Sequence, residues 1–137
     1  MAKVAIVGAG RVGSTLAYTL VTSGPVREVV LVDADAERAL GEAMDLTDAT
    51  VFFSPVDVRA GELADSRGAA VTVLAAGAAQ RPHETRLDLL RRNVAVFREI
   101  VPEIRRANPD GILLVATNPV DVLTYAALRM SGLPPQR

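Results

Sequence analysis

A glycine-rich segment near the amino terminus has residue types and a spacing that could bind a phosphate group. This segment, Gly8–Gly13, reads GAGRVG and directly follows the apolar run Val4–Val7. In a strand-to-helix turn, Gly8 would permit the tight bend, Gly10 would let a ligand approach the backbone, and Gly13 would let helix and strand pack closely. The first turn of that helix also offers free N–H groups and a positive dipole to an anion.

A carboxylate follows twenty residues after the last of these glycines. Asp33 ends a second apolar run, Val29–Val32. An acid at this place accepts hydrogen bonds from ribose hydroxyls and repels a 2′-phosphate. The alternative is that Asp33 only caps the next helix. Because glycines, runs and spacing agree, the sequence predicts dinucleotide binding and favours NAD over NADP.

A polar loop, Gly77–Arg86, is the third segment whose residue types could bind or activate a ligand. It reads GAAQRPHETR and follows the apolar run Val71–Ala76. Ligands of open α/β sheets bind at the carboxyl ends of strands, where this loop begins. A guanidinium carried by such a loop could clamp an anionic or carbonyl substrate. The alternative is a solvated surface loop without a ligand.

The elements that must position these residues alternate along the chain. Short, nearly continuous apolar runs are typical of strands buried on both faces. They lie at 4–7, 29–32, 71–76 and 112–116, with a weaker edge strand at 56–58. Helical patterns lie at 11–23, 35–49 and 86–107, and a last helix follows Asn118-Pro119. We expect Pro102 to kink or split the third helix and Asn118 to cap the fourth. The alternation predicts an α/β fold with a doubly wound parallel sheet, the Rossmann type.

Composition narrows the class of protein. The 137 residues are half apolar and 23% charged, which excludes a disordered chain and fits one domain. The net charge of −1 leaves no electrostatic footprint for nucleic acid or membrane, so we expect neither as a partner. The absence of cysteine excludes disulfides and zinc–thiolate sites and is compatible with the cytoplasm. We expect no metal site.

Four segments in this order resemble the lactate/malate dehydrogenase family: GAGRVG, LVD, AGAAQRPHETRLDL and ATNPVD. The last two are specific to that family. The resemblance implies an NAD-dependent oxidoreductase of glycolysis and fermentation, which reduces pyruvate to L-lactate. It also implies a cytoplasmic homotetramer acting on a small molecule. Two alternatives stay open, namely a malate dehydrogenase and a non-catalytic NAD-sensing module.

The resemblance also assigns residues to the cofactor. The pyrophosphate turn would include Val12 beside the three glycines. Asp33 would bind the adenosine ribose, with Arg38 near the adenosine. Further along the chain, five residues would contact the rest of the cofactor and its nicotinamide side: Gly77, Ala78, Ala116, Thr117 and Asn118.

On the substrate side, Arg86 matches the catalytic arginine that polarises the carbonyl, since a fixed positive charge stabilises the transition state. Gln80 matches the specificity position, and its neutral side chain favours pyruvate over oxaloacetate. The adjacent Arg81 would reverse that preference if the loop shifted by one residue. Asn118 and Asp121 complete the expected substrate-binding set.

The only histidine, His83, matches a loop position that commonly holds glycine in the family, and we expect it to be an exposed loop residue. The family's proton-carrying histidine occurs in a Gly-x-His-Gly context that this sequence lacks. We therefore expect residues 1–137 to be an NAD-binding part with five strands. The sixth strand and the substrate domain would be absent, leaving 112–116 as an apolar edge.

Overall fold

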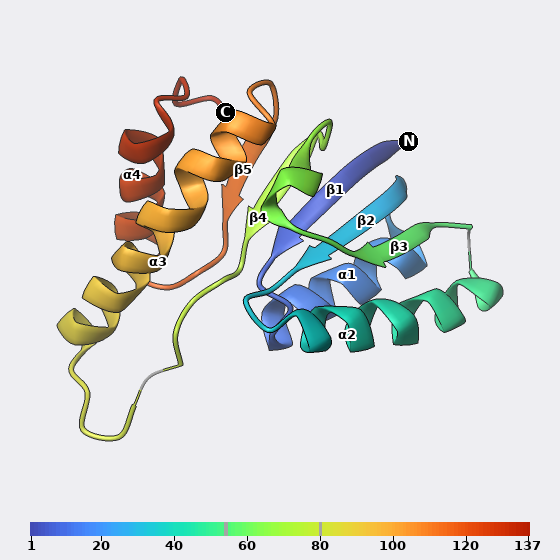
Figure 1. Ribbon diagram of the computed structural model, residues 1–137, viewed down its shortest axis with the longest axis horizontal. Helices are drawn as coiled ribbons and strands as arrows, with labels where there is room; N and C mark the ends of the chain where they lie inside the picture. Colours follow the sequence, from blue (N-terminus) through green and yellow to red (C-terminus); the bar gives the residue numbers. More distant parts are fainter. Residues whose placement is uncertain (54, 80) are drawn as a thin grey trace.

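The computed structural model describes residues 1–53, 55–79 and 81–137. Its centre is a sheet of five parallel strands (Figure 1). In chain order these are β1 (Ala2–Val7), β2 (Val26–Val32), β3 (Asp57–Ala60), β4 (Val71–Leu74) and β5 (Ile112–Val115). Across the sheet the order is β3-β2-β1-β4-β5, so the chain winds outward from β1 and then crosses to its other side. The predicted doubly wound parallel sheet is confirmed.

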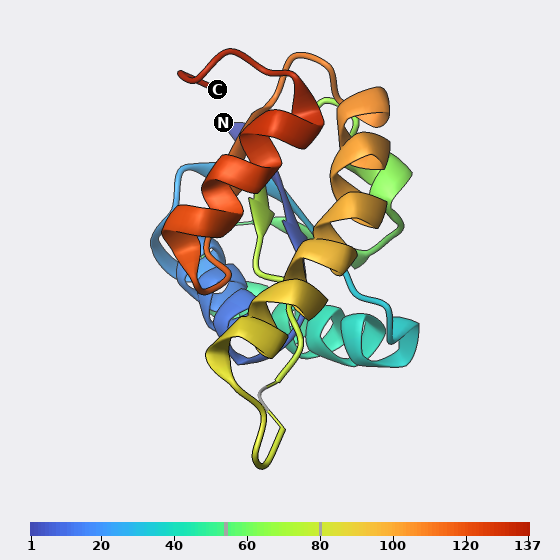
Figure 2. The ribbon, with the colours of Figure 1, turned by 90° about the vertical axis from the view of Figure 1, so that its left-hand side faces the viewer.

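Helices cover both faces of this sheet. The longer ones are α1 (Arg11–Ser23), α2 (Ala36–Ala49), α3 (Arg86–Ala107) and α4 (Val120–Ser131), and the short 3₁₀ helices are η1 (Thr50–Phe52) and η2 (Leu63–Ser66). α1 and α2 pack on one face, whereas α3 and α4 pack side by side on the other (Figure 2). The protein therefore has three layers, helix, sheet and helix.

Two apolar cores result from the alternation of side chains along the strands. Ile6 and its neighbours on one face pack with Ala17 of α1 and Ala43 of α2. The next residue, Val7, points the other way and packs with Phe97 of α3 and Leu123 of α4. Because successive strand residues face opposite sides, a stretch of strand buried on both faces must be apolar at every position, as Val4–Val7 of β1 and Val29–Val32 of β2 are.

The two edge strands differ from the central ones. Among the described residues β3 pairs only with β2, as expected of a weak edge strand. β5 pairs only with β4 along the described residues, and it is the exception to burial on both faces. Leu113 and Val115 pack against the second core, while Ile112 and Leu114 are 43% and 48% exposed.

The predicted split of the third helix and the predicted cap of the fourth were wrong. α3 runs unbroken through Pro102, because residues on either side of the proline pack on the sheet; Phe97, Val101 and Ile104 are fully buried. At the start of α4, Pro119 rather than Asn118 is the N-cap, since the first helical bond runs from the Leu123 N–H to the Pro119 carbonyl.

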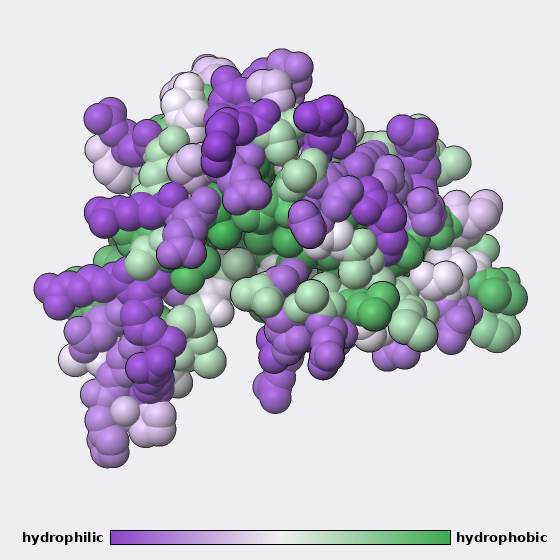
Figure 3. Space-filling model, viewed as in Figure 1, coloured by the Kyte–Doolittle hydropathy of each residue, from purple (hydrophilic) through white to green (hydrophobic). Residues whose placement is uncertain are grey.

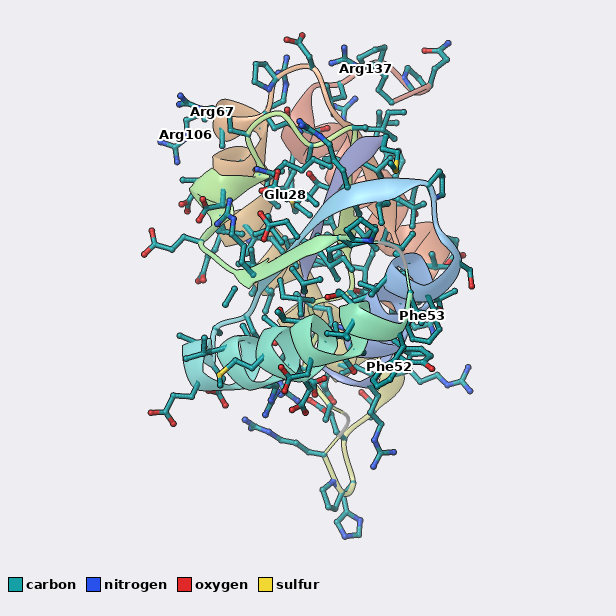
Figure 4. All side chains as sticks on the ribbon, turned by 90° about the vertical axis from the view of Figure 1, so that its right-hand side faces the viewer. Glu28, Phe52, Phe53, Arg67, Arg106 and Arg137 are labelled. Carbon is teal, nitrogen blue, oxygen red and sulfur yellow. The ribbon has the colours of Figure 1, made fainter. Side chains whose placement is uncertain are left out.

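Ion pairs link three strands at the amino-terminal half of the sheet. Glu28 of β2 accepts both Lys3 of β1, at 3.3 Å, and Arg59 of β3, at 3.2 Å. Arg59 also pairs with Asp65 of η2 at 3.1 Å. Figure 4 shows Glu28 among the strands, far from Phe52 at the end of α2. Among the described residues, no helix is long and apolar enough to cross a membrane.

Candidate functional site

The glycine turn lies at the carboxyl end of β1 and leaves no room for side chains at two positions. Gly8 has φ +108°, and a Cβ there would lie 2.4 Å from the Ala76 nitrogen. A Cβ on Gly13 would lie 1.8 Å from the Gly8 carbonyl oxygen. Gly8 also donates its N–H to the Val32 carbonyl at 2.7 Å, which ties the turn to β2. Gly13 therefore allows the close approach of α1 to β1, and Gly8 allows the close approach of the turn to the segment after β4.

Gly10 has a different role, because it opens onto space. A Cβ there would meet nothing within 4 Å. Gly10 is the N-cap of α1, with no side-chain hydrogen bond to the cap and no acid in the first turn. The helix therefore presents N–H donors and a positive dipole end to whatever enters beside Gly10.

Asp33 follows β2 and lies beside this turn. Its Oδ2 accepts the Ala9 N–H at 2.7 Å, and its Oδ1 accepts the Asp35 N–H at 2.9 Å. The carboxylate is half-buried and faces the cleft described next. Because each oxygen can accept more than one hydrogen bond, Asp33 can fix the glycine turn and still accept from a ligand hydroxyl.

A cleft of about 610 Å³ runs along the carboxyl ends of the strands. It brings together six of the predicted site residues: Gly8, Gly10, Asp33, Arg38, Gly77 and Ala78. Arg38 also pairs loosely with Asp35, at 3.7 Å on the surface. The position agrees with the rule that ligands of open α/β sheets bind where the strand order reverses, here between β1 and β4.

Sequence reasoning missed part of the cleft wall. Residues after β3 line it, namely Gly61, Glu62 and Leu63. So do Val96, Ile100 and Glu103, which share one face of α3. The first group could have been found from the strand-end rule, and the second from its spacing of four and three residues. In Figure 3, hydrophobic surface extends across the middle of this side, between hydrophilic groups above and the hydrophilic loop below.

A second group of predicted residues lies in the connection between β5 and α4. Thr117 is buried, and its hydroxyl donates to the Ala76 carbonyl at 2.6 Å and the Leu74 carbonyl at 3.1 Å. Ala116 is half-buried, and Asn118 is exposed. This connection therefore packs directly against the segment that follows β4.

The remaining predicted residues lie outside the cleft. Arg86 is the exposed first residue of α3, and Asp121 is exposed in the first turn of α4. Val12 is 60% exposed on the first turn of α1, while Gly13 is buried beneath it. Gln80 lies outside the described residues.

Polar contacts stabilise the loop before α3. Glu84 accepts Arg92 at 2.7 and 2.9 Å and the Arg81 N–H at 2.8 Å. The Arg81 N–H, followed by Arg92, lowers the pKa of Glu84, which keeps this carboxylate charged. His83 is exposed at φ +65°, a conformation that glycine adopts without strain. This backbone accounts for the expectation that glycine suits the position.

A family model described as lactate/malate dehydrogenase, NAD binding domain, matches residues 2–137. The chain belongs to the lactate/malate dehydrogenase family. It is 57% identical over 135 residues to the L-lactate dehydrogenase of Thermus aquaticus, covering 98% of this chain and 44% of that protein. It is 49% identical over 134 residues to the L-lactate dehydrogenase of Thermoanaerobacterium saccharolyticum, covering 98% and 43%.

Solved structures of the family share the fold. The minor L-lactate dehydrogenase of Enterococcus mundtii matches with a TM-score of 0.93 and 43% identity, over 97% of this chain and 43% of that one. The malate dehydrogenase of Archaeoglobus fulgidus in complex with NADH matches with a TM-score of 0.90 and 40% identity, over 96% and 46%. The chain thus spans less than half of the relatives named here.

The residues present fit the family's cofactor, NAD. The open space beside Gly10 admits a pyrophosphate against the uncapped end of α1. Asp33 lines the same cleft, and its carboxylate oxygens can accept hydrogen bonds of the kind that ribose hydroxyls donate. Leu63 and Ile100 supply apolar walls of the kind that a flat base needs. The predicted family, fold class and cofactor are confirmed.

Proposed function

We propose that residues 1–137 form the NAD-binding domain of an NAD-dependent L-lactate dehydrogenase, which reduces pyruvate to L-lactate. The observation that carries this proposal is the open, uncapped turn at Gly10 facing Asp33 across one cleft. Two curated relatives, at 57% and 49% identity, bear the name L-lactate dehydrogenase, which supports the choice of substrate.

The binding roles belong to residues that line the cleft and to residues beside it. Gly8, Gly10 and Gly13 shape the pyrophosphate site, with Val12 in the first turn of α1. Asp33 accepts from the adenosine ribose, and Arg38 lies beside it. The nicotinamide side belongs to the residues that follow β4 and β5: Gly77, Ala78, Ala116, Thr117 and Asn118.

The substrate side rests on Arg86, Gln80, Asn118 and Asp121. When bound, NADH supplies the hydride. Arg86 is the catalytic residue whose positive charge stabilises the charge that develops on the substrate oxygen. The neutral Gln80 gives no partner to a second carboxylate, which favours pyruvate. His83 is exposed on the loop, so we expect residues 1–137 alone to bind NADH without reducing pyruvate.

A fluorescence titration with NADH tests the cofactor site. In Asp33→Ala, affinity should fall by about 1–3 kcal/mol, because a charged acceptor is lost. Asp33→Asn serves as the matched control, because it keeps an oxygen for the Ala9 N–H while removing the charge. Affinity for NADPH should rise relative to NADH in both variants. Equal NADH affinity in wild type, Asp33→Ala and Asp33→Asn would contradict the proposed site.

Malate dehydrogenase is the second candidate, and the Archaeoglobus fulgidus structure favours it at 40% identity. Arg81, next to Gln80, is a further reason to test it. The natural protein that carries these residues should prefer pyruvate to oxaloacetate, and Gln80→Arg should reverse that order. A preference for oxaloacetate before any substitution would identify a malate dehydrogenase instead.

We also propose that the protein acts in the cytoplasm as a homotetramer. Exposed apolar side chains on α2 and η1 support self-association, among them Leu40, Met44 and Phe52, which are 53%, 60% and 83% exposed. Phe52 and Phe53 lie together at the end of α2 in Figure 4. Sedimentation of the natural protein measures the state directly, and a monomer at micromolar concentration would contradict the proposal.

A further inference from the structure

One buried amide joins the two segments to which the nicotinamide side is assigned. Asn93 of α3 is only 2% exposed. Its Oδ1 accepts the Ala78 N–H at 2.8 Å, and its Nδ2 donates to the Asn118 carbonyl at 3.0 Å. Ala78 follows β4 and Asn118 follows β5, so a single side chain spans the carboxyl ends of two neighbouring strands.

The contacts around this amide leave little freedom between the two segments. A Cβ on Gly77 would lie 2.7 Å from Thr117 Cγ2 and 3.3 Å from Asn93 Oδ1. The Thr117 hydroxyl also donates to the Ala76 carbonyl at 2.6 Å. The two segments are therefore packed in direct contact, with Asn93 fixing their separation from the α3 side.

The chemistry of the position calls for an amide. One end must accept from an N–H and the other must donate to a carbonyl, so a single orientation of the Asn93 amide satisfies both. An ionised aspartate would offer two acceptors and would set an oxygen against the Asn118 carbonyl. An apolar side chain would leave two buried backbone groups without partners.

We propose that Asn93 is a positioning residue for the nicotinamide end of the cofactor, a proposal that rests on the function proposed above. Asn93 does not line the cleft, so it acts through the backbones of Ala78 and Asn118. The adenosine and pyrophosphate sites depend instead on Asp33 and on the turn before α1. Loss of Asn93 should therefore weaken binding of the whole dinucleotide while sparing ligands that end at the pyrophosphate.

The same helix offers a matched control. Asn108, the C-cap of α3, is 7% exposed and donates its Nδ2 to the Ala69 carbonyl at 2.8 Å. Ala69 precedes β4, so this bond lies at the opposite, amino-terminal end of the strand. Fifteen residues of helix, about 22 Å, separate the two asparagines. Removing the Asn108 side chain also breaks a hydrogen bond of a buried amide, but that bond does not contact the cleft.

The experiment compares two probes, NADH and ADP, on the 137-residue chain and its variants. In Asn93→Ala, affinity for NADH should fall about tenfold while affinity for ADP stays within twofold of wild type. Asn93→Asp, close to the native shape, should show the same split and decides the matter if the alanine variant does not fold. Asn108→Ala should lower the melting temperature and change neither affinity by more than twofold.

Three results would overturn the positioning role. They are an equal loss of NADH and ADP affinity in the Asn93 variants, no loss in either, or an NADH-specific loss in Asn108→Ala. Failure of the proposed function looks different, because the wild-type chain would then bind neither probe. The ratio of the two affinities is thus a readout that general destabilisation does not move.

Discussion

The amino termini of α1 and α3 lie at the same edge of the sheet and are built in opposite ways. α1 begins at Gly10 without a side-chain cap, directly after β1. α3 begins at Thr85 after a long loop, and a reciprocal pair of bonds with Asp88 caps it. One helix start leaves its donors to a ligand, while the other satisfies them with its own side chains.

The two helix starts therefore have different roles: the start of α1 is open to a ligand, and the start of α3 stabilises the fold. At α1, glycines and the Asp33–Ala9 bond set the backbone, so the site is shaped before a ligand arrives. At α3, the Thr85–Asp88 pair and the Glu84–Arg92 pair give the loop order without a ligand. A side chain added at the first site should therefore compete with the ligand, whereas one removed at the second should only cost stability.

The largest expected effect tests how tightly α1 is built onto β1. Gly13→Ala places a methyl group 1.8 Å from the Gly8 carbonyl oxygen, so the helix must shift. We expect the free energy of unfolding to fall by about 3 kcal/mol. Gly41→Ala is the control, since nothing lies within 4 Å of its Cβ position in α2 and alanine should add about 0.5–1 kcal/mol. Urea unfolding measures both, and similar values would contradict the close approach.

The next effect is on affinity and concerns the missing cap itself. Gly10 has φ −75° and open space at its Cβ, so Gly10→Asp fits and supplies a carboxylate to the N–H groups of α1. Stability should rise by about 0.5 kcal/mol, while NADH affinity should fall about 100-fold, because the carboxylate would occupy the proposed pyrophosphate site and repel the phosphates.

The substitution Gly10→Asn separates the effect of the added negative charge from the effect of a side chain that fills the space. Its side chain has nearly the same shape without the charge, so we expect a loss of about tenfold in NADH affinity. If Gly10→Asp binds NADH as well as wild type, the end of α1 is not the phosphate site and the contrast with α3 loses its meaning.

Local sequence patterns account for most of what could be predicted about the fold and the site. The turn at Gly8–Gly13 and the acid at Asp33 are local patterns whose chemistry is fixed by spacing. The cap of α4 was mispredicted at Asn118, because the choice between adjacent residues depends on where the first helical bond forms.

The features that could not be predicted from the sequence depend on contacts between residues that are far apart in the chain. Pro102 stays inside α3 because packing on the sheet outweighs local preference. The cleft wall at Glu62 and Glu103 joins residues far apart in the chain. Asn93 gives no signal of its own, since its role exists only once β4 and β5 lie side by side.

Another substitution removes the side-chain cap of α3. Thr85→Ala deletes the hydroxyl that accepts the Asp88 N–H at 3.1 Å. We expect the free energy of unfolding to fall by about 1 kcal/mol, with NADH affinity within twofold of wild type. Thr85→Ser keeps the acceptor and should behave like wild type. A loss of NADH affinity in Thr85→Ala but not in Thr85→Ser would show that this helix start also serves the cofactor.

The smallest effect is the pH dependence of that cap. Hydrogen bonds from the Thr85 hydroxyl and backbone N–H lower the pKa of Asp88 below its ordinary 3.8. Because the folded pKa is the lower one, the stabilisation is complete above the unfolded value and is lost as pH falls through the folded value. The difference in unfolding free energy between wild type and Asp88→Ala should therefore be constant from about pH 7 to 5 and shrink below about pH 4. In a Thr85→Ala background the shrinkage should become smaller but persist, because the backbone N–H of residue 85 still donates to Asp88, and an undiminished shrinkage would assign the low pKa to that N–H or to Arg91 at 3.7 Å instead of to the hydroxyl.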